Sequence, residues 1–362
     1  MPRMFDMLRP KDKGKGFKAK EAPEKMPPKE KPLVFPKEIL REGAEERKRK
    51  QEDHFLTTKK LISIVRKHGV DNQDTAKEIY ESSLVTIREL LRKVRHDEDL
   101  NTYMGSIYSM LDSIFNQLLL GDNLLKHLYD EGEQEYYLPY HIVNTLILSS
   151  YIGIHAGFNK SKLKTLGLAS LFCDVGLDTV KEVITQPRHL TDAERHMIMG
   201  HIYKSIEVTK KVDSIDNAVK EAIVTHHERI NGSGYPRSLK DDDINPYARI
   251  IGLVDTYEAM THIRPHREGM NAHKTMKFII DIFRNYFDLN IVKLLIEKMS
   301  IYPIGSIVKL DTEELARVVG VRQGSPLRPV VMIVKDAFDK PVRERVIIDL
   351  SKQESPSITE PI

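Results

Sequence analysis

Apolar residues recur at intervals of three and four positions between about residues 37 and 132, as in the series Ile107, Leu111, Ile114 and Leu118. That spacing places them on one face of an α-helix, so we predict a helical N-terminal region over residues 37–132. No group of metal-binding or nucleophilic side chains recurs on these predicted helices. We interpret the region as an input or dimerisation element, and a homodimer formed through these helices is one expectation.

The pattern stays helical over residues 133–300 and then changes. Further along, apolar and polar residues alternate in four runs, at residues 306–310, 316–321, 329–334 and 345–350. Alternation with a period of two is typical of half-buried β-strands. We therefore predict a mainly α fold, in which a helical bundle over residues 133–300 follows the N-terminal helices. A small β appendage over residues 301–350 and a short tail over residues 351–362 complete the prediction.

Residues 1–36 differ from the rest of the chain in composition. They hold 10 Lys or Arg residues against 5 acidic residues, together with 7 of the 18 prolines. The net charge of the chain is +3, so this segment at +5 leaves −2 on the remaining residues. We predict a disordered basic tail, which serves either as a solubilising tether or as an arm for an acidic surface. Its prolines and acids dilute the positive charge, which argues against specific nucleic acid binding.

The overall composition excludes several classes of protein. With 40% apolar and 30% charged residues, the chain has enough hydrophobic material for a core. Its single cysteine, Cys173, excludes an intrachain disulfide framework and fits a reducing compartment. The most apolar stretch, residues 142–158, falls short of the roughly 20 residues that span a bilayer, and residues 1–20 lack the apolar run of a signal peptide. We expect a soluble, cytoplasmic protein with no transmembrane segment.

Two adjacent histidines, His226 and His227, give the first chemical signal. They precede the Gly-rich turn Asn231-Gly-Ser-Gly-Tyr-Pro236. Its glycines allow positive φ angles, and its proline fixes the exit of the loop. Such a loop can hold two imidazoles on a shared site, although two solvent-facing histidines without a function fit the same segment.

The order of a larger set of residues resembles a known family. The set runs along the chain as His141, Cys173-Asp174-Val-Gly, His201, His226-His227-Glu228-Arg229, Gly234-Tyr235-Pro236, Asp255 and Arg264-Pro265-His266-Arg267. It resembles the HD-GYP domain, a branch of the HD superfamily of metal-dependent phosphohydrolases that is associated with bacterial cyclic di-GMP phosphodiesterases. The resemblance covers about residues 136–299.

The resemblance implies a helical bundle around two divalent metal ions, usually iron or manganese. Asp174 would bridge the two ions, and it is the residue assigned to catalysis. Two adjacent cations polarise a phosphodiester oxygen and activate a bridging water, and imidazoles and carboxylates suit such ions. Matched by position, the ligands of the first ion would be His141, Asp174 and Asp255, and those of the second Asp174, His201, His226 and His227.

Cys173 departs from the family at the first metal position, where the family has the histidine of its His-Asp pair. A metal–sulfur bond of about 2.3 Å is only slightly longer than a metal–imidazole bond, so a thiolate does not replace the reach of a ring. We therefore expect Cys173 to fall short of the ion. Two alternatives stay open: a ligand that shifts the preference toward zinc, or a buried cysteine that acts as a small apolar residue.

Leu177 is a second departure, three residues past Asp174, where the family usually has a lysine directed at the substrate phosphate. Losing that ammonium removes positive charge from the place where negative charge builds in the transition state, a contribution often worth about 3 kcal/mol. Lys181, one turn further along, replaces it only if the helix continues and the side chain points inward.

The resemblance assigns two arginines to the substrate pocket. Arg264 and Arg267 would contact phosphate or guanine, because a guanidinium suits both by bidentate bonding and stacking. His266 stands where the family commonly has tyrosine. Tyr137 occupies the position of a glutamate that supports a third ion in some members, so we expect no third metal site.

Gly234, Tyr235 and Pro236 form the loop that shapes the pocket in the family and is implicated in contacts with diguanylate cyclase domains. We favour a phosphodiesterase that opens cyclic di-GMP to pGpG with weakened activity, because six of the seven expected ligands are present. The alternative is a catalytically impaired relative that binds cyclic di-GMP or a partner protein. A generic HD nucleotidohydrolase fits less well, because the Gly-Tyr-Pro and Arg-Pro-x-Arg motifs belong to the cyclic dinucleotide branch.

Overall fold

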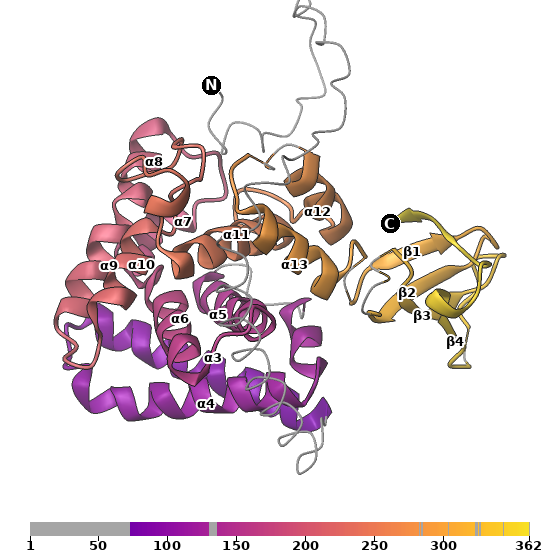
Figure 1. Cartoon of the computed structure of the whole chain (residues 1–362), viewed down its shortest axis with the longest axis horizontal. Helices are drawn as coiled ribbons and strands as arrows, with labels where there is room; N and C mark the ends of the chain where they lie inside the picture. The colour runs from indigo at the N-terminus through magenta and orange to yellow at the C-terminus, as the bar shows by residue number, and fades with distance from the viewer. Residues whose placement is uncertain are drawn as a thin grey trace, which may run out of the picture. The chain divides into compact units, whose positions relative to one another are not determined.

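The computed structural model describes residues 73–129 and 136–361, apart from positions 282, 284, 303, 323, 324, 326 and 343. Helices occupy this part of the chain as far as Met299, and strands follow from Ile307 (Figure 1). The predicted fold class, a mainly helical protein with a small β appendage, is therefore confirmed. The predicted basic tail over residues 1–36 and the helices predicted before residue 73 lie outside the described residues.

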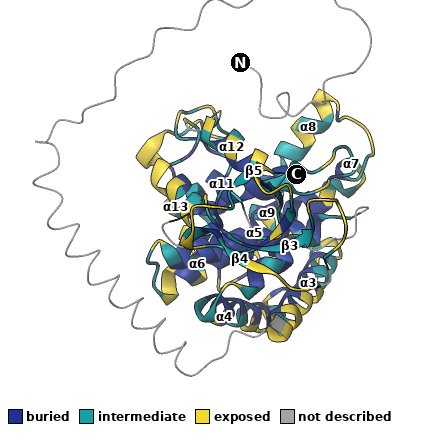
Figure 2. Ribbon diagram, turned by 90° about the vertical axis from the view of Figure 1, so that its right-hand side faces the viewer, coloured by how far each residue is buried: buried dark blue, intermediate teal, exposed yellow. Residues whose placement is uncertain are grey.

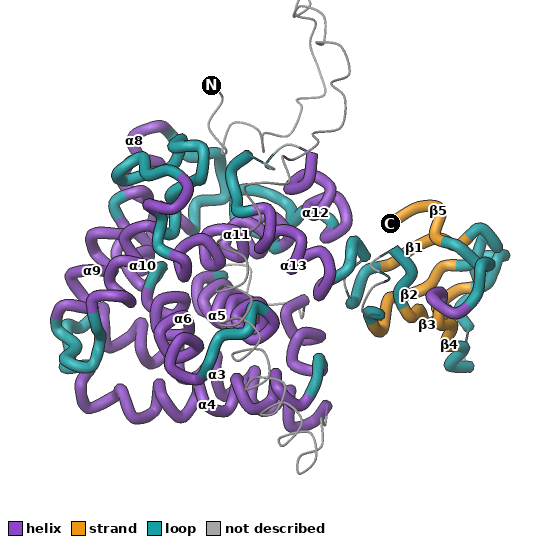
Figure 3. The backbone as a smooth tube through the Cα atoms, viewed as in Figure 1, coloured by secondary structure: helices purple, strands orange, loops and turns teal. Residues whose placement is uncertain are grey.

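Turns, loops and 3-10 segments connect the helices, and Figure 3 draws the loops and turns in teal. The helices are α3 (Gln73–Arg95), α4 (Met104–Leu120), α5 (Leu138–His155), α6 (Lys160–Phe172), α7 (Lys181–Ile184), α8 (Asp192–Met199), α9 (His201–Lys210), α10 (Asn217–Thr225), α11 (Pro246–Thr261), α12 (Ala272–Asp281) and α13 (Leu289–Met299). The 3-10 segments among them are η1 (Asn101–Tyr103), η2 (Asn123–Tyr129), η3 (Val175–Val180) and η4 (Asp241–Asp243).

Helices α3 and α4 each bury one apolar face against α5. Ile87 and Leu90 on α3, like Ile107 and Ile114 on α4, are fully buried. These positions carry the spacing of three and four that predicted the helices, so the pattern correctly identified the buried face. The N-terminal helices and the helix that carries His141 therefore share one core.

Helix α5 is buried around its whole circumference. Every residue from His141 to Ile154 is buried, and the helix is dark blue in Figure 2. It packs against α3, α6, α11 and α13. A helix that is apolar on every side needs cover on every side, which accounts for the most apolar stretch of the sequence. Among the described residues, no helix combines the length and the apolar character that crossing a bilayer needs.

An ion pair ties α3 to the segment that follows Asp174. Asp178 in η3 is buried, and Arg95 at the end of α3 donates to its two carboxylate oxygens at 3.0 and 2.9 Å. The hydroxyl of Tyr136 also donates to Asp178. A bidentate contact between a guanidinium and a carboxylate is directional as well as strong. Helix α3 and η3 thereby hold each other in position.

The C-terminal part is a five-stranded antiparallel sheet with the strand order β4-β3-β2-β1-β5. The strands are β1 (Ile307–Leu310), β2 (Leu315–Gly320), β3 (Val330–Lys335), β4 (Ile347–Asp349) and β5 (Ile358–Pro361), with η5 (Leu350–Lys352) after β4. Alternate residues of β1, β2 and β3 enter one small core together with Leu350. The four alternating runs of the sequence correctly predicted β1 to β4.

The predicted tail over residues 351–362 is wrong, because this segment completes the sheet. Strand β5 pairs with β1, with Ile358 opposite Leu310 and Pro361 opposite Val308. The side chain of Ile358 packs against the sheet core. A four-residue strand that ends in a proline is too short to show a period of two, so the pattern gave no signal for it.

Arg328 fastens the connection between β4 and β5. It donates to the carbonyls of Gln353 and Glu354 at 2.6 and 2.7 Å. Arg328→Ala should lower the free energy of unfolding by about 1–3 kcal/mol, because these are charge-assisted hydrogen bonds. Hydrogen exchange in β5 should become faster. Arg322→Ala is the matched control, since its exposed pair with Asp349 is worth about 0–1 kcal/mol. Equal effects of the two changes on β5 would contradict this account.

Candidate metal centre

Asp174 lies in a tight turn between α6 and η3. Ser205 donates from Oγ to the carbonyl of Cys173 at 2.7 Å and accepts from the backbone N–H of Gly176 at 2.9 Å. A Cβ on Gly176 would lie 2.2 Å from the carbonyl oxygen of His201, so this close approach to α9 requires glycine. The turn therefore places the carboxylate of Asp174 next to the start of α9.

Three buried side chains from separate segments meet at the first group, which consists of His141 on α5, Asp174, and Asp255 on α11. His141 Nε2 lies 3.1 Å from Asp174 Oδ2 and 3.1 Å from Asp255 Oδ1. The ligand atoms of the three residues lie within 4.8 Å of one another. The structure thus brings together the residues that were matched to the first ion.

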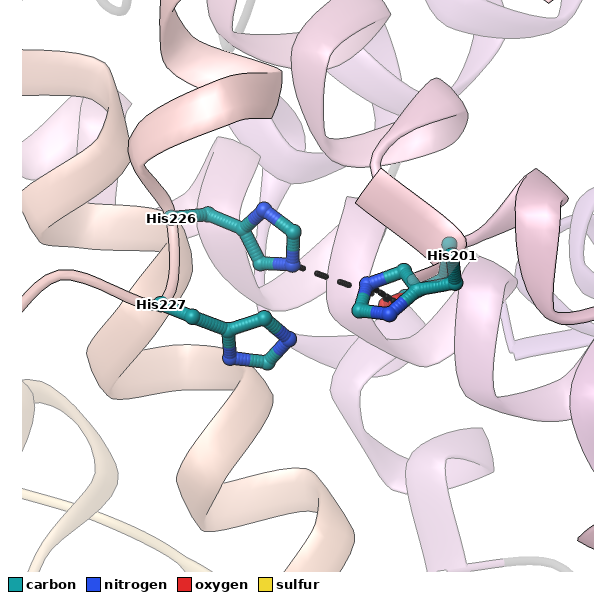
Figure 4. Close-up of side chains that lie close together, drawn as sticks. His201, His226 and His227 are labelled. Carbon is teal, nitrogen blue, oxygen red and sulfur yellow. Dashed lines mark ion pairs between the residues drawn. The ribbon is translucent and has the colours of Figure 1, made fainter. Parts of the chain in front are cut away.

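Asp174 is shared with a second group, which it forms with His201, His226 and His227. His201 Nε2 lies 3.2 Å and His226 Nε2 3.9 Å from Asp174 Oδ1. Figure 4 shows the three imidazoles converging from the start of α9 and from the segment after α10. The residues that were matched to the second ion are therefore also neighbours in space.

The donors of the second group fit a divalent ion. Nδ1 of His201 donates to the carbonyl of Ile198 at 2.6 Å, and Nδ1 of His226 donates to that of Ile223 at 2.7 Å. These bonds leave each Nε2 lone pair directed at the group. Both Nε2 atoms are buried and have no hydrogen-bond partner in the part of the chain that the structure describes. Because orphaned buried atoms are costly, an ion among them stabilises this arrangement.

The protonation states of His226, His227 and Asp174 suit metal binding. Burial lowers the pKa of His226 below its ordinary value, and it lowers the pKa of His227 still further. Burial alone would raise the pKa of Asp174, but the imidazoles of His141 and His201 hold it well below its usual range. Neutral imidazoles and an ionised carboxylate are the forms that coordinate a metal.

The Gly-Tyr-Pro loop packs directly on the second group. The ring of Tyr235 stacks on that of His227, with 4.7 Å between the centroids. A Cβ on Gly234 would lie 2.4 to 2.5 Å from backbone atoms of residues 227–229, so the loop requires glycine there. Glu228, to which the sequence analysis gave no role, accepts two backbone N–H groups that follow the loop, at 2.6 and 3.0 Å. Its carboxylate therefore fixes the loop against the histidine pair.

Cys173 lies beside the first group without belonging to it. Its buried thiol donates to the carbonyl of Ser170 at 3.3 Å and lies 3.5 Å from Asp174 Oδ2. Among the described residues, neither group of converging ligand atoms includes its sulfur. Burial raises the pKa of the Cys173 thiol well above its ordinary value, which disfavours the thiolate that a metal needs. This geometry favours the small, buried cysteine over the zinc ligand.

Leu177 is a buried residue of η3, and the amine of Lys181 is directed elsewhere. Helix α7 does begin at Lys181, but Nζ of this residue lies 4.0 Å from the ring centroid of Tyr136. A cation above an aromatic face is held by the quadrupole of the ring. Lys181 is therefore engaged by Tyr136 in this structure.

The two arginines that were matched to the substrate pocket lie just beyond α11. Arg264 is buried, with Nη2 2.9 Å from Glu258 Oε2 and its guanidinium 3.7 Å above the ring of Tyr137. Arg267 donates to the carbonyl of Ala259, and burial together with the charge of Arg264 lowers its pKa to about 10. Both guanidinium groups thus already have protein acceptors.

Glu258 is a buried residue of the site that the sequence analysis missed. It contacts Nδ1 of His141, and its carboxylate raises the pKa of His141 well above the ordinary value, although burial acts in the opposite direction. The available signal was its position three residues after Asp255, which puts both carboxylates on one face of α11.

Comparisons with known proteins agree with this geometry. Residues 125–291 match the HD domain family, and residues 307–362 match the KOW domain associated with the HD domain. A cyclic di-GMP phosphodiesterase of Pseudomonas aeruginosa is 26% identical over 264 residues, which are 73% of this chain and 63% of that protein. The cyclic di-GMP phosphodiesterase PdeB of Borreliella burgdorferi is 24% identical over 216 residues, which are 59% of this chain and 55% of that protein.

A solved structure also shares the fold. The HDG"Y"P protein Bd1817 of Bdellovibrio bacteriovorus superposes with a TM-score of 0.52 at 18% identity, over 66% of this chain and 76% of that one. The chain contains an HD domain related to those of the HD-GYP cyclic di-GMP phosphodiesterases. It spans only 55 to 63% of the length of the two curated relatives.

Gly234 supplies a test of the loop geometry. Gly234→Ala should lower the free energy of unfolding by about 1–3 kcal/mol, because its Cβ would overlap backbone atoms of residues 227–229, which must then shift. Gly105→Ala is the matched control, since no atom lies within 4 Å of its added Cβ on α4. That change should be neutral or stabilising by up to about 1 kcal/mol. Chemical denaturation measures both, and a harmless Gly234→Ala would contradict the close approach.

His266 should make stability depend on pH. Burial, followed by the charges of Arg267 and Arg264, lowers the pKa of His266 to about 4. In the unfolded chain a histidine has a pKa of about 6.5. Between about pH 6.5 and pH 4, His266 therefore binds a proton in the unfolded chain but not in the folded chain. The free energy of unfolding therefore falls as the pH falls through this window.

His266→Phe removes this proton uptake. The drop in melting temperature of the metal-free protein between about pH 7 and pH 5 should become smaller in this variant. His196→Phe, which replaces an exposed histidine on α8, is the control and should keep the wild-type profile. Identical pH profiles for His266→Phe and the wild type would refute the assignment.

Proposed function

We propose that this protein is a metal-dependent phosphodiesterase that opens cyclic di-GMP to linear pGpG. The observation that carries the proposal is the pair of ligand groups that share Asp174. A shared carboxylate would hold two cations close together, and two adjacent cations stabilise both the attacking and the leaving oxygen of an in-line displacement. The relatedness of the HD domain to cyclic di-GMP phosphodiesterases supports the choice of substrate.

The proposed roles divide between the two groups. His141, Asp174 and Asp255 would hold one ion, while Asp174 and the three histidines at positions 201, 226 and 227 would hold the other. Iron or manganese suits this set of imidazoles and carboxylates. When bound, the ions supply Lewis-acid activation of the phosphate and lower the pKa of the attacking water. The chain itself supplies the fixed orientation of each donor.

The loop and the arginines provide the substrate contacts in this proposal. Burial raises the pKa of Tyr235, so its hydroxyl stays protonated and is available to donate to a phosphate oxygen. Gly234 and Pro236 hold that ring against His227. Arg264 and Arg267 each use part of a guanidinium on protein acceptors, and the remaining N–H groups are available for phosphate or guanine. The same loop is a proposed contact for diguanylate cyclase domains.

The expected rate is lower than that of a site with the complete family pattern. Cys173 contributes no ligand to the first group in this geometry, and Leu177 supplies no charge to the phosphate. Each lost electrostatic contact to a developing charge is worth about 3 kcal/mol, or roughly a hundredfold in rate.

A second candidate function is binding without turnover. The burial of Cys173 and Leu177, where the family pattern has a ligand and a cation, favours this alternative specifically. The second group and the Gly-Tyr-Pro loop then serve to recognise cyclic di-GMP or a protein partner. In that case the protein is a sensor or scaffold.

Restoring the family residues should raise activity. We expect slow hydrolysis of cyclic di-GMP by the full chain loaded with iron or manganese, and faster hydrolysis by Cys173→His and by Cys173→His with Leu177→Lys. The gain should be roughly tenfold to a thousandfold in kcat/KM, because one ligand and one phosphate contact return. Chromatography of pGpG and metal analysis per chain measure the two effects.

Cys173→Ser is the matched control, since serine adds no ring and should leave both metal content and rate unchanged. Cyclic GMP–AMP, which differs by one base, tests whether the guanine matters. If the wild type binds cyclic di-GMP in calorimetry but hydrolyses neither dinucleotide, that result would reject the phosphodiesterase and support the sensor. Neither hydrolysis nor binding would reject both functions.

A further inference from the structure

Glu258 is a buried carboxylate to which the proposed reaction gives no task. It lies on α11 one turn after Asp255, and only 3% of its surface is exposed. Its side chain contacts neither Asp174 nor the histidines of the second group in any interaction that the structure shows. Among the described residues, its side chain instead contacts His141, Asn144, His262 and Arg264.

The two nitrogens of the His141 imidazole face different carboxylates. Nδ1 of His141 meets Glu258 Oε2, while Nε2 lies 3.1 Å from Asp174 and 3.1 Å from Asp255. A carboxylate oxygen only accepts at neutral pH, so Nδ1 carries a hydrogen toward Glu258, although Arg264 Nη2 also lies 3.1 Å from this nitrogen. Nε2 is the atom that faces the first group, and it gives up its proton when an ion binds there. A ring held at both edges has no freedom to rotate.

Positive charge and hydrogen-bond donors stabilise Glu258 in its buried position. Arg264 Nη2 lies 2.9 Å from Oε2, and the side chain of Asn144 donates to Oε1 at 3.3 Å. His262 Nδ1 lies 3.2 Å from Oε1. The guanidinium of Arg264, which always carries its charge, forms an ion pair with this carboxylate. A buried carboxylate needs such neighbours, because an unpaired one is strongly destabilising.

The partners of Glu258 are themselves fixed from several helices. Asn144 accepts from the hydroxyl of Tyr80 on α3 at 2.9 Å, and it also donates to the carbonyl of Leu128 at 3.3 Å. His262 Nε2 lies 2.6 Å from the same carbonyl. Asn144 on α5, together with His262 and Arg264 just after α11, therefore holds Glu258, and Tyr80 on α3 in turn holds Asn144.

We infer that Glu258 is a positioning residue: it fixes the imidazole of His141 with Nε2 toward Asp174 and Asp255, and it thereby sets the affinity of the first group for a divalent ion. Arg264 contributes indirectly to the first group, because its ion pair with Glu258 fixes the carboxylate that contacts His141. The inference rests on the metal binding that the proposed function requires. Removing an outer carboxylate from a metal-binding histidine costs 10-fold to 100-fold in metal affinity, as an approximate general range.

Glu258→Gln is the variant that tests this role. It keeps the size of the side chain and one acceptor oxygen but removes the charge. The full chain is freed of metal and titrated with Mn²⁺ and with Co²⁺ in the background His226→Ala, which weakens the second group so that the first group is observed. We expect Glu258→Gln to weaken Mn²⁺ binding there by about 10-fold to 100-fold and to change the Co²⁺ absorption bands.

Glu228→Gln is the matched control. Glu228 is an equally buried glutamate of the same domain, but it accepts backbone N–H groups of the loop and does not contact His141. Its replacement should leave the Mn²⁺ affinity of the first group within about twofold of the background, while Asp255→Asn should abolish that binding.

Glu258→Asp separates positioning from folding. Aspartate keeps the charge with a shorter side chain, so it should recover part of the lost Mn²⁺ affinity at a melting temperature no higher than that of Glu258→Gln. Affinities that simply follow the melting temperatures of the metal-free variants would overturn the inference in favour of a structural role. Unchanged Mn²⁺ binding in Glu258→Gln overturns it directly, as does the absence of any binding at the first group of the background protein.

The inference and the proposed function fail in different ways. A selective loss of Mn²⁺ affinity in Glu258→Gln, in a protein that hydrolyses no cyclic dinucleotide, sustains the positioning role and rejects the phosphodiesterase. Hydrolysis by the wild type, with the same Mn²⁺ affinity in Glu258→Gln, rejects the positioning role and sustains the enzyme.

Discussion

The arrangement of the helical core depends on one buried carboxylate, that of Asp174. One of its oxygens faces His141 and the other faces His201 and His226, so side chains from α5, α9 and the segment after α10 converge on a single residue. Taking an ionised carboxylate out of water costs several kcal/mol, and only surrounding donors or cations offset that cost. Gly176 helps to meet this requirement, because it lets the turn that carries Asp174 approach the start of α9.

Much of this arrangement is present in the sequence, and the reasons for the rest are physical. The apolar periods predicted the helices and β1 to β4, because each element buries one face or alternate residues. The order of His141, Asp174, His201, His226, His227 and Asp255 predicted that they meet. By contrast, β5 is too short to show a period, and the partners of Glu258 are side chains of other helices, which no local pattern encodes.

The two ligand groups differ in how far their polar atoms are satisfied by the protein alone. In the first group, both edges of the His141 ring already contact carboxylates. In the second, the Nε2 atoms of His201 and His226 are buried and have no hydrogen-bond partner among the described residues. The free energy of folding therefore gains more from an ion at the second group, and an ion at the first must displace contacts that the folded chain makes by itself.

The ion pair between Arg95 and Asp178 bears on how the molecule unfolds. It joins the helix that precedes the HD domain to η3, and the apolar faces of α3 and α4 are covered by α5. Melting the N-terminal helices alone would expose the buried face of α5 and remove the bidentate partner of a buried carboxylate. The boundary predicted near residue 132 thus separates helices without metal-binding side chains from the bundle that carries them, but both parts share one core. Helices that share a core unfold together, which gives a single thermal transition.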